Sequence, residues 1–272
     1  MNSASKKIVI KIGTSSLTYG TGMLNYRHIE EMADVVCDLK NMGHKIVIVS
    51  SGAVGIGLGK INNRKKIEEQ CEKPAESSKK RALAAAGQSG LMAVYEELFN
   101  VYNCQVAQAL LTKSSLENAD NRDVIAGAFE EMFAYDVLPI VNENDVAAGD
   151  DASSGDLFGD NDTLSAYVAK FIKADMLIIW SDIDGLYDKD PRINANAKLI
   201  PVVTEINGDI HKAAGGVGSP RGSGGMATKL RAAKTVMDAG IDMVITNSAN
   251  PENLYGIING EKTGTLFKAV KR

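Results

Sequence analysis

The sequence predicts an α/β protein built on a largely parallel β-sheet. Short runs rich in β-branched residues, at 8–12 and 45–49, are typical of strands buried on both faces. A helical pattern at 26–42 lies between them and ends at Gly43, a residue type favoured just after helices. Because strand, polar turn and helix recur along the chain, consecutive strands are expected to run parallel.

The remaining elements follow in the same order. The expected strands are 8–12, 45–49, 106–111, 137–141, 174–180 and 243–246, with a short extended segment at 199–203. The expected helices are 26–42, 82–100, 121–134, one that starts at 161–162 with Asp160 or Asn161 as its cap, and one that ends at Gly240. The charged stretch 62–81 is interpreted as a solvated loop or an exposed helix. The small residues of 82–100 permit close packing, against the sheet or against another subunit.

Composition excludes several classes of function. The 272-residue chain has a formal charge of −4 at pH 7, whereas a nucleic-acid-binding surface needs concentrated basic residues. Its three cysteines lack C-x-x-C spacing, so neither a disulfide framework nor a zinc site is indicated. The sequence shows no signal-peptide core and no membrane-spanning run. We therefore expect a cytoplasmic protein that binds small molecules and has no nucleic-acid or membrane partner.

The stretch 219–229, SPRGSGGMATK, predicts an anion site. Glycines and serines precede Thr228 and Lys229, where an amphipathic helix begins. A helix start offers unpaired N–H donors, glycine lets an oxygen approach the backbone, and lysine adds positive charge for phosphate. The alternative is a plain surface turn, but the polar stretch 207–225 is longer than most loops in compact domains. The P-loop pattern G-x-x-x-x-G-K-[ST] does not occur in the sequence.

Lys11 is a second candidate for binding an anion. It lies near the carboxyl end of the first strand, and Gly13 opens a polar turn after it. Open α/β sheets bind ligands at this edge, so we expect the lysine to meet an anion there. The alternative is a lysine whose stem extends to the surface without a function.

The stretch 143–162 carries seven carboxylates and no lysine or arginine. These residues are Glu143, Asp145, Asp150, Asp151, Asp156, Asp160 and Asp162. Repulsion among them destabilises the fold unless cations offset it, so positive charge is expected here. Mg²⁺, a substrate ammonium and the two lysines above are the candidates. A solvated acidic loop is a credible alternative for Asp150, Asp151 and Asp156.

Ordered segments along most of the chain resemble the glutamate 5-kinases, a branch of the amino acid kinase family. The matching segments are 11–15 (KIGTS), 49–53 (VSSGA), 85–88 (AAGQ), 140–145 (IVNEND), 159–162 (GDND), the glycine loop with its helix start at 219–233, and 264–267 (GTLF). This resemblance implies a three-layer αβα sandwich around an open, largely parallel sheet.

The resemblance also implies an organisation for the whole chain. We expect a single domain over 1–272, in which about 1–170 bind glutamate and about 171–272 bind ATP. Many family members continue into an RNA-binding-type PUA domain, which we do not expect here, and hence no RNA partner. The family likeness further suggests Mg²⁺, a homo-oligomer (dimer or tetramer) and proline as a feedback inhibitor.

Residue by residue, the resemblance implies roles for the site. Lys11 and Lys229 would flank the transferred phosphoryl group, and Asp162 would hold both lysines. The substrate-binding residues would be Ser51, Gly52, Asp145 and Asn161, with Asp145 at the ammonium and Asn161 and Ser51 at carboxylate oxygens. The nucleotide-binding residues would be Lys11, Gly13, Ser181, Asp182, Ser223, Gly224, Gly225, Met226, Ala227, Thr228 and Lys229, while Gly13, Ser51 and Gly52 would supply N–H donors. No metal ligand is assigned.

The chemistry implied is transfer of phosphate from ATP to the γ-carboxylate of L-glutamate, the first step towards proline. A glutamate side chain, with a pKa of about 4.3, is ionised at neutral pH and needs no general base, which suits a chain with three histidines. The alternatives are an acetylglutamate kinase or aspartokinase type, a non-catalytic amino-acid sensor on the same fold, or a dinucleotide-binding oxidoreductase. The last is disfavoured because G-x-G-x-x-G is missing.

Overall fold

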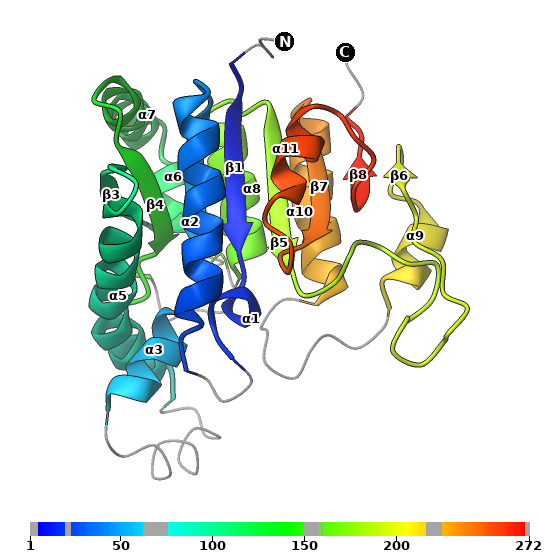
Figure 1. The fold of residues 1–272 in the computed structure, drawn as a ribbon, viewed down its shortest axis with the longest axis horizontal. Coiled ribbons are helices and arrows are strands. Elements are labelled where there is room, and N and C mark those ends of the chain that lie inside the picture. The colour runs from blue at the N-terminus through cyan, green and yellow to red at the C-terminus, as the bar shows by residue number, and fades with distance from the viewer. Residues whose placement is uncertain are drawn as a thin grey trace.

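A computed structural model describes residues 5–19, 23–61, 76–148, 158, 160–215 and 225–269. Its centre is one eight-stranded sheet with the order β3-β4-β2-β1-β5-β7-β8-β6 (Figure 1). The strands are β1 (Lys7–Ile12), β2 (Lys45–Ser50), β3 (Val106–Leu111), β4 (Leu138–Glu143), β5 (Met176–Ser181), β6 (Val202–Val203), β7 (Asp242–Asn247) and β8 (Thr265–Phe267). Neighbouring strands are parallel except β7 and β8. The expected largely parallel sheet is confirmed.

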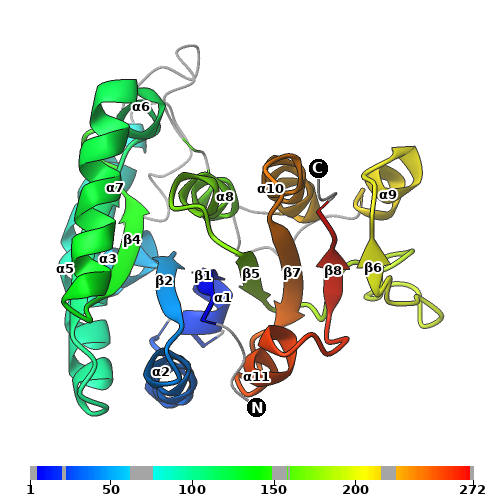
Figure 2. The ribbon, with the colours of Figure 1, turned by 90° about the horizontal axis from the view of Figure 1, so that it is seen from above.

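Helices cover both faces of the sheet, as Figure 2 shows from above. The described helices are α1 (Thr14–Leu17), α2 (Tyr26–Asn41), α3 (Ala53–Lys60), α5 (Glu76–Asn100), α6 (Lys113–Glu117), α7 (Ala119–Ala134), α8 (Asn161–Phe171), α9 (Gly208–Ala213), α10 (Met226–Asp238) and α11 (Asn253–Ile258). One apolar cluster joins the sheet to α2, α5 and α11, and a second joins it to α7, α8 and α10. The protein is therefore a three-layer αβα sandwich.

The position of β1 explains where a ligand site can form. β1 pairs with β2 on one side and with β5 on the other. The chain thus builds one half of the sheet from β1 to β4 and the other half from β5 to β8. The carboxyl end of β1 is consequently a topological switch point, where open α/β sheets leave a crevice for ligands.

Alternation along β1 determines which way Lys11 points. Ile8, Ile10 and Ile12 pack in the cluster with α2 and α11, whereas Val9 packs in the cluster with α8 and α10. Successive side chains of a strand point to opposite faces. Lys11 therefore faces α8 and α10, together with Val9.

The structure differs from the sequence prediction mainly in its helices. α5 begins at Glu76, inside the charged stretch 62–81, rather than at residue 82. Helices of four to eight residues, such as α1, α3 and α6, were not predicted because they are too short to show a helical period. α9 lies within the polar stretch interpreted as a loop, where Asn207 caps it by accepting from the N–H groups of Asp209 and Ile210.

The small residues of α5 serve close packing within the chain. A Cβ atom on Gly87 would lie 1.7 Å from the carbonyl oxygen of Ala53, and one on Gly57 would lie 2.0 Å from that of Leu83. Only glycine allows α3 and α5 to approach so closely. At these positions the helix packs against α3, a partner that the sequence analysis did not consider.

Among the described helices, none is both long enough and apolar enough to cross a lipid bilayer.

Candidate functional site

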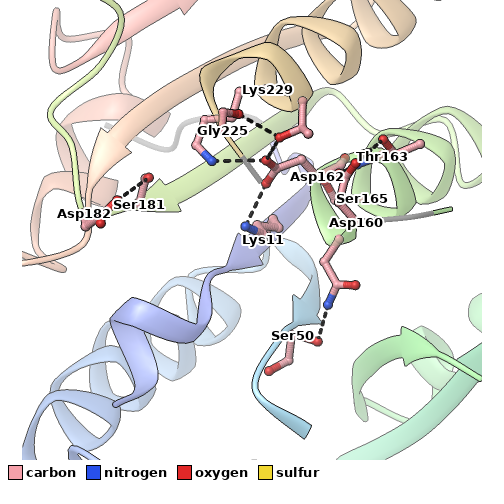
Figure 3. A network of polar contacts seen from close by, with 12 residues as sticks. Lys11, Ser50, Asp160, Asp162, Thr163, Ser165, Ser181, Asp182, Gly225 and Lys229 are labelled. Carbon is pink, nitrogen blue, oxygen red and sulfur yellow. Dashed lines mark hydrogen bonds and ion pairs between the residues drawn. The ribbon is translucent and has the colours of Figure 1, made fainter. Parts of the chain in front are cut away.

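Two lysines that are distant in sequence meet on one carboxylate at the switch point of the sheet. Lys11 Nζ lies 2.7 Å from Oδ1 of Asp162, and Lys229 Nζ lies 3.1 Å from Oδ2 (Figure 3). All three residues are buried, and Asp162 is 1% exposed. Asp162 therefore contacts both lysines in the structure, and its expected role in holding them for catalysis stays a prediction.

Each of these side chains is positioned by a different element. Lys11 belongs to the central strand, Asp162 to the first turn of α8, and Lys229 to the first turn of α10. An acid at a helix start is favoured by the helix dipole, whereas a cation there is disfavoured. Lys229 therefore depends on a nearby negative charge, which Asp162 provides.

The Asp162 carboxylate is fixed by further hydrogen bonds. The hydroxyl of Thr228 donates to its Oδ2 at 2.8 Å and also lies 2.8 Å from the carbonyl oxygen of Gly225. The backbone N–H of Thr228 donates to that same Gly225 carbonyl. Both hydrogen-bond donors of Thr228, the hydroxyl and the backbone N–H, are thus used within the protein. Its hydroxyl orients Asp162, and its expected place among the nucleotide-binding residues stays a prediction.

The charge state of the cluster follows from burial opposed by ion pairing. Burial acts to raise the pKa of Asp162, but the charges of Lys11 and Lys229 outweigh it and hold that pKa at about 2. Burial lowers the pKa of Lys11, and Asp162 opposes this shift. At neutral pH Asp162 is therefore a carboxylate whose negative charge is shared by two cations.

A second ion pair joins α8 to α10 beside this cluster. Asp160 caps α8 by accepting from the backbone N–H of Thr163 at 2.8 Å, and Arg231 Nη2 lies 3.2 Å from its Oδ2. The cations expected opposite the acidic stretch are thus Lys11 and Lys229 at Asp162, and Arg231 at Asp160. Asp150, Asp151 and Asp156 lie outside the described residues.

Three helices that start at the site lack side-chain caps, namely the four-residue α1 after Gly13 and the longer α3 and α10. Gly52 begins α3 in a left-handed conformation (φ +104°), and Gly225 begins α10. Five other described helices are capped by a side chain, namely those that follow Asn25, Thr112, Asn118, Asp160 and Asn207. The uncapped N–H groups of α3 and α10 are accordingly available to an anionic ligand.

Backbone pairing corrects one expected donor. The N–H group of Ser51 donates to the carbonyl oxygen of Ile12 at 3.0 Å and is not available to a ligand. Its hydroxyl forms no hydrogen bond within the described chain. Gly13 lies close to Lys11, since a Cβ atom on this glycine would be 3.6 Å from the lysine Nζ.

A chain of three side-chain amides lies on the β4 side of the cluster. Asn161 Nδ2 donates to the carbonyl oxygen of Ser50 at 2.7 Å and to Oδ1 of Asn142 at 3.1 Å. Asn142 Nδ2 donates in turn to Oε1 of Gln88 at 2.9 Å. Because the carbonyl of Ser50 can only accept, it fixes the orientation of the Asn161 amide. Both N–H groups of Asn161 are used, so the expected pairing with a carboxylate oxygen does not fit and its free atom is the acceptor Oδ1.

Two partly desolvated carboxyl groups lie at the carboxyl end of β4, one on its last residue, Glu143, and one just beyond it, on Asp145. Burial raises the pKa of Glu143, which accepts from the N–H group of Phe158 at 3.0 Å. Burial also raises the pKa of Asp145, and the charge of Lys80 opposes the shift. An ammonium group at Asp145 would restore the charged state that burial disfavours.

A pocket opens beside the lysine pair, between the ends of β5 and β7 and the start of α10. Its lining includes the expected residues Ser181, Asp182, Gly225, Met226 and Lys229. Ala227 and Thr228 are not among the lining residues, and Ser223 and Gly224 lie outside the described part of the chain.

Several residues that line the pocket were not predicted from the sequence. Tyr187, Arg192 and Asn247 all line the pocket. Asn247 pairs with Ser181 across the sheet, so the rule that ligands bind at carboxyl strand ends could have found it. Tyr187 and Arg192 carried no comparable signal, because they come from the irregular segment after β5.

Comparisons with known proteins agree with this architecture. The model of the "Amino acid kinase family" matches residues 6–247. Glutamate 5-kinases of Clostridium perfringens and Clostridium acetobutylicum are 47% and 45% identical to this chain, covering 98% and 96% of it and 97% and 94% of their own lengths. The solved carbamate kinase from Giardia lamblia, bound to AMP-PNP, superposes with a TM-score of 0.68 at 18% identity, covering 98% of this chain and 99% of its own. At that identity the last comparison concerns the fold alone.

Proposed function

The chain belongs to the amino acid kinase family and, within it, to the glutamate 5-kinases, and on this premise we propose how its residues carry out the reaction. The enzyme transfers the γ-phosphoryl group of ATP to the γ-carboxylate of L-glutamate, which is the first step of proline synthesis. The observation that carries the assignment of roles is the meeting of Lys11 and Lys229 on Asp162.

We propose that the two lysines neutralise the phosphoryl group during transfer. A carboxylate oxygen of glutamate forms a bond to the γ-phosphorus, and the bond from that phosphorus to the β,γ-bridging oxygen breaks, which releases ADP. Negative charge spreads over the transferring oxygens in such a reaction, and positioned cations stabilise it. The buried ammonium groups of Lys11 and Lys229 would supply these cations without reorganisation.

Asp162 and Thr228 would set the geometry of the lysines. Each oxygen of Asp162 faces one lysine, which keeps the two ammonium groups on separate sides of the carboxylate. The Thr228 hydroxyl holds that carboxylate in place. Asp162 is thus a positioning residue in this proposal, since its oxygens are occupied by the lysines.

Glutamate would bind on the side of β2 and β4. Asp145 and the free Oδ1 of Asn161 offer acceptors for the substrate ammonium, and the Ser51 hydroxyl offers a donor for a carboxylate oxygen. The uncapped start of α3 at Gly52 adds N–H groups nearby. This half of the sheet corresponds to the expected glutamate-binding part, residues 1–170.

ATP would bind in the pocket beside β5 and α10. Gly225 and Met226 begin a helix whose first N–H groups have no helical partner, which suits phosphate oxygens. Ser181 and Asp182 line the same pocket at the carboxyl end of β5. This division of the chain into a glutamate half and a nucleotide half is part of the proposal.

The described residues hold no group of three or more histidine, cysteine or acidic side chains that could bind a metal ion. Protein residues alone thus do not fit a Mg²⁺ cage. We propose that Mg²⁺ arrives with ATP, because this ion is often bound mainly by substrate phosphates and water. Cytoplasmic location, proline feedback and a homo-oligomer stay predictions.

The test is an assay of ADP release with purified protein across several acceptors. L-Glutamate, N-acetyl-L-glutamate and L-aspartate should be compared at equal concentrations, and the acyl phosphate should be trapped with hydroxylamine. We expect turnover with L-glutamate and little with the other two. Preference for either alternative acceptor would overturn the proposed function, and preference for N-acetyl-L-glutamate, which has no ammonium group, would also overturn the proposed roles of Asp145 and Asn161.

A further inference from the structure

Gln88 has a buried donor without a partner at the end of the amide chain. Its side chain is 8% exposed, and its Oε1 accepts from Asn142. Its Nε2 is buried and forms no hydrogen bond with the described residues. Leaving such a donor unsatisfied destabilises the fold, so each case in a native protein calls for an explanation.

The amide chain fixes which atom of Gln88 is left over. The Ser50 carbonyl can only accept, so Asn161 must present its nitrogen to it and to Asn142 Oδ1. Asn142 then has only its nitrogen to offer, and Gln88 must meet it with Oε1. A flip of Gln88 would place two N–H groups against each other. The unpaired group is therefore a donor by necessity.

The direction of the chain points to the group this donor would meet. Asn161 is adjacent in sequence to Asp162, whereas Gln88 lies two hydrogen bonds farther from the lysine pair. The γ-carboxylate of glutamate must lie at the lysines to receive phosphate. Its α-carboxylate, at the other end of the molecule, is then the anion directed towards Gln88.

From this arrangement we propose that Gln88 is a substrate-binding residue whose Nε2 donates to the α-carboxylate of glutamate. The proposal rests on the proposed function. Trp180 Nε1 is also buried without an acceptor among the described residues. Its side chain, however, belongs to the apolar cluster that joins the sheet to α2, α5 and α11, and no hydrogen bond links it to polar side chains described there. Within the described part of the protein, only Gln88 combines a buried, unpaired side-chain donor with a hydrogen-bonded connection to the proposed glutamate site.

The main test is Gln88→Glu, assayed at pH 7.5. The new carboxylate can still accept from Asn142 Nδ2, but it replaces the donor by an oxygen that repels the substrate. We expect the KM for L-glutamate to rise about 10- to 100-fold, the scale for losing a hydrogen bond to a charged group. The KM for ATP should not change, and kcat should change by less than about threefold.

A substrate fragment separates binding from positioning. 4-Aminobutyrate keeps the ammonium and the reacting carboxylate but lacks the α-carboxylate. If Gln88 contacts the α-carboxylate, Gln88→Glu and Gln88→Met weaken glutamate and leave the inhibition constant of 4-aminobutyrate unchanged. Equal losses for both ligands would mean that Gln88 only positions Asn142, and the proposal would be overturned.

The matched control is Gln105→Glu. Gln105 is an exposed glutamine before β3 that donates to Asn100 Oδ1, and its replacement should leave all constants unchanged. Circular dichroism establishes that the variants fold. If the wild-type enzyme does not turn over glutamate, the proposed function fails; if it does and Gln88→Glu keeps its KM, the inference alone fails.

Discussion

Lys229 lies in the first turn of α10 with its Nζ 3.1 Å from Oδ2 of Asp162, which lies in the first turn of α8. The starts of α8 and α10 therefore face each other and carry side chains of opposite charge. Both of these side chains are almost fully buried. A cation at a helix start and an ion pair away from water are each unfavourable in isolation. Their combination here is what a phosphate-transfer site would require, and it gives the first two predictions.

Replacing Lys229 by methionine should lower kcat by about 10²- to 10³-fold, the scale for losing one donor to the transition state. Methionine keeps much of the length of the side chain, so packing changes little. The control is Lys234→Met on the same helix, where the lysine is mostly exposed and pairs with Asp238. The measurement is steady-state kinetics, with folding checked by circular dichroism. Turnover near that of the wild type in a folded Lys229→Met variant would contradict the assignment.

Acid should remove the stabilisation that Asp162 contributes. Its pKa is about 2 in the folded protein against an ordinary value of 3.8, so its ionisation stabilises the fold above pH 3.8 and this contribution is lost as the pH falls towards 2. By linkage the difference is about 2 kcal/mol.

The measurement is urea unfolding of the wild type and Asp162→Asn at several pH values. The wild type should be the more stable protein near pH 6, because the neutral amide of the variant cannot offset two buried lysines. Its advantage should shrink by about 2 kcal/mol between about pH 5 and pH 2. An advantage that stays constant over this range would show that the two lysines do not lower the pKa of the Asp162 carboxyl group.

Asp145→Asn should raise the KM for L-glutamate about 10- to 100-fold, since a charged hydrogen bond to the substrate ammonium is replaced by a neutral one. The KM for ATP should be unaffected, because the proposed nucleotide pocket lies on the other half of the sheet. Asp238→Asn on the exposed face of α10 serves as the control. Equal increases in both KM values would argue for a structural role.

Gly87→Ala should destabilise the protein by about 1–3 kcal/mol or prevent folding, because its Cβ would lie 1.7 Å from the carbonyl oxygen of Ala53. Gly127→Ala in α7 is the matched control, since nothing lies within 4 Å of the added atom. There the same change should stabilise the helix by roughly 0.5–1 kcal/mol. The measurement is the thermal unfolding midpoint of each variant. Similar midpoints for Gly87→Ala and Gly127→Ala would contradict the close approach of α3 and α5 at Gly87.

The sequence was sufficient to predict the six longer strands and to single out Lys11, Asp162 and Lys229, for related reasons, but it did not predict the three-residue strand β8. Buried parallel strands are continuous apolar runs, and a charged residue inside such a run, as at Lys11, stands out. Asp162 and Lys229 were found because acidic and glycine-rich stretches contrast with the segments around them. The alternation along β1 then brings Lys11 to the face that carries both partners.

The pairings within the site could not be read from the sequence. That Asn161 would use both N–H groups on Ser50 and Asn142 depends on contacts between residues far apart in the chain. The same holds for Thr228, whose hydroxyl turns to Asp162. Six-residue helices such as α9 were also not predicted, because a helix that short contains less than two turns and shows no clear helical period.

The separation of Lys11 and Lys229 along the chain has a consequence for synthesis. Lys11 is in β1 and Lys229 is in α10, so all elements from α1 to α9 leave the ribosome between the two lysines. Until α10 docks, Lys11 and Asp162 can pair but no second ammonium is present, and the proposed nucleotide pocket has no wall at Gly225. Under the proposed mechanism a nascent chain is therefore catalytically silent until α10 has been made and has docked, whatever else has folded before it.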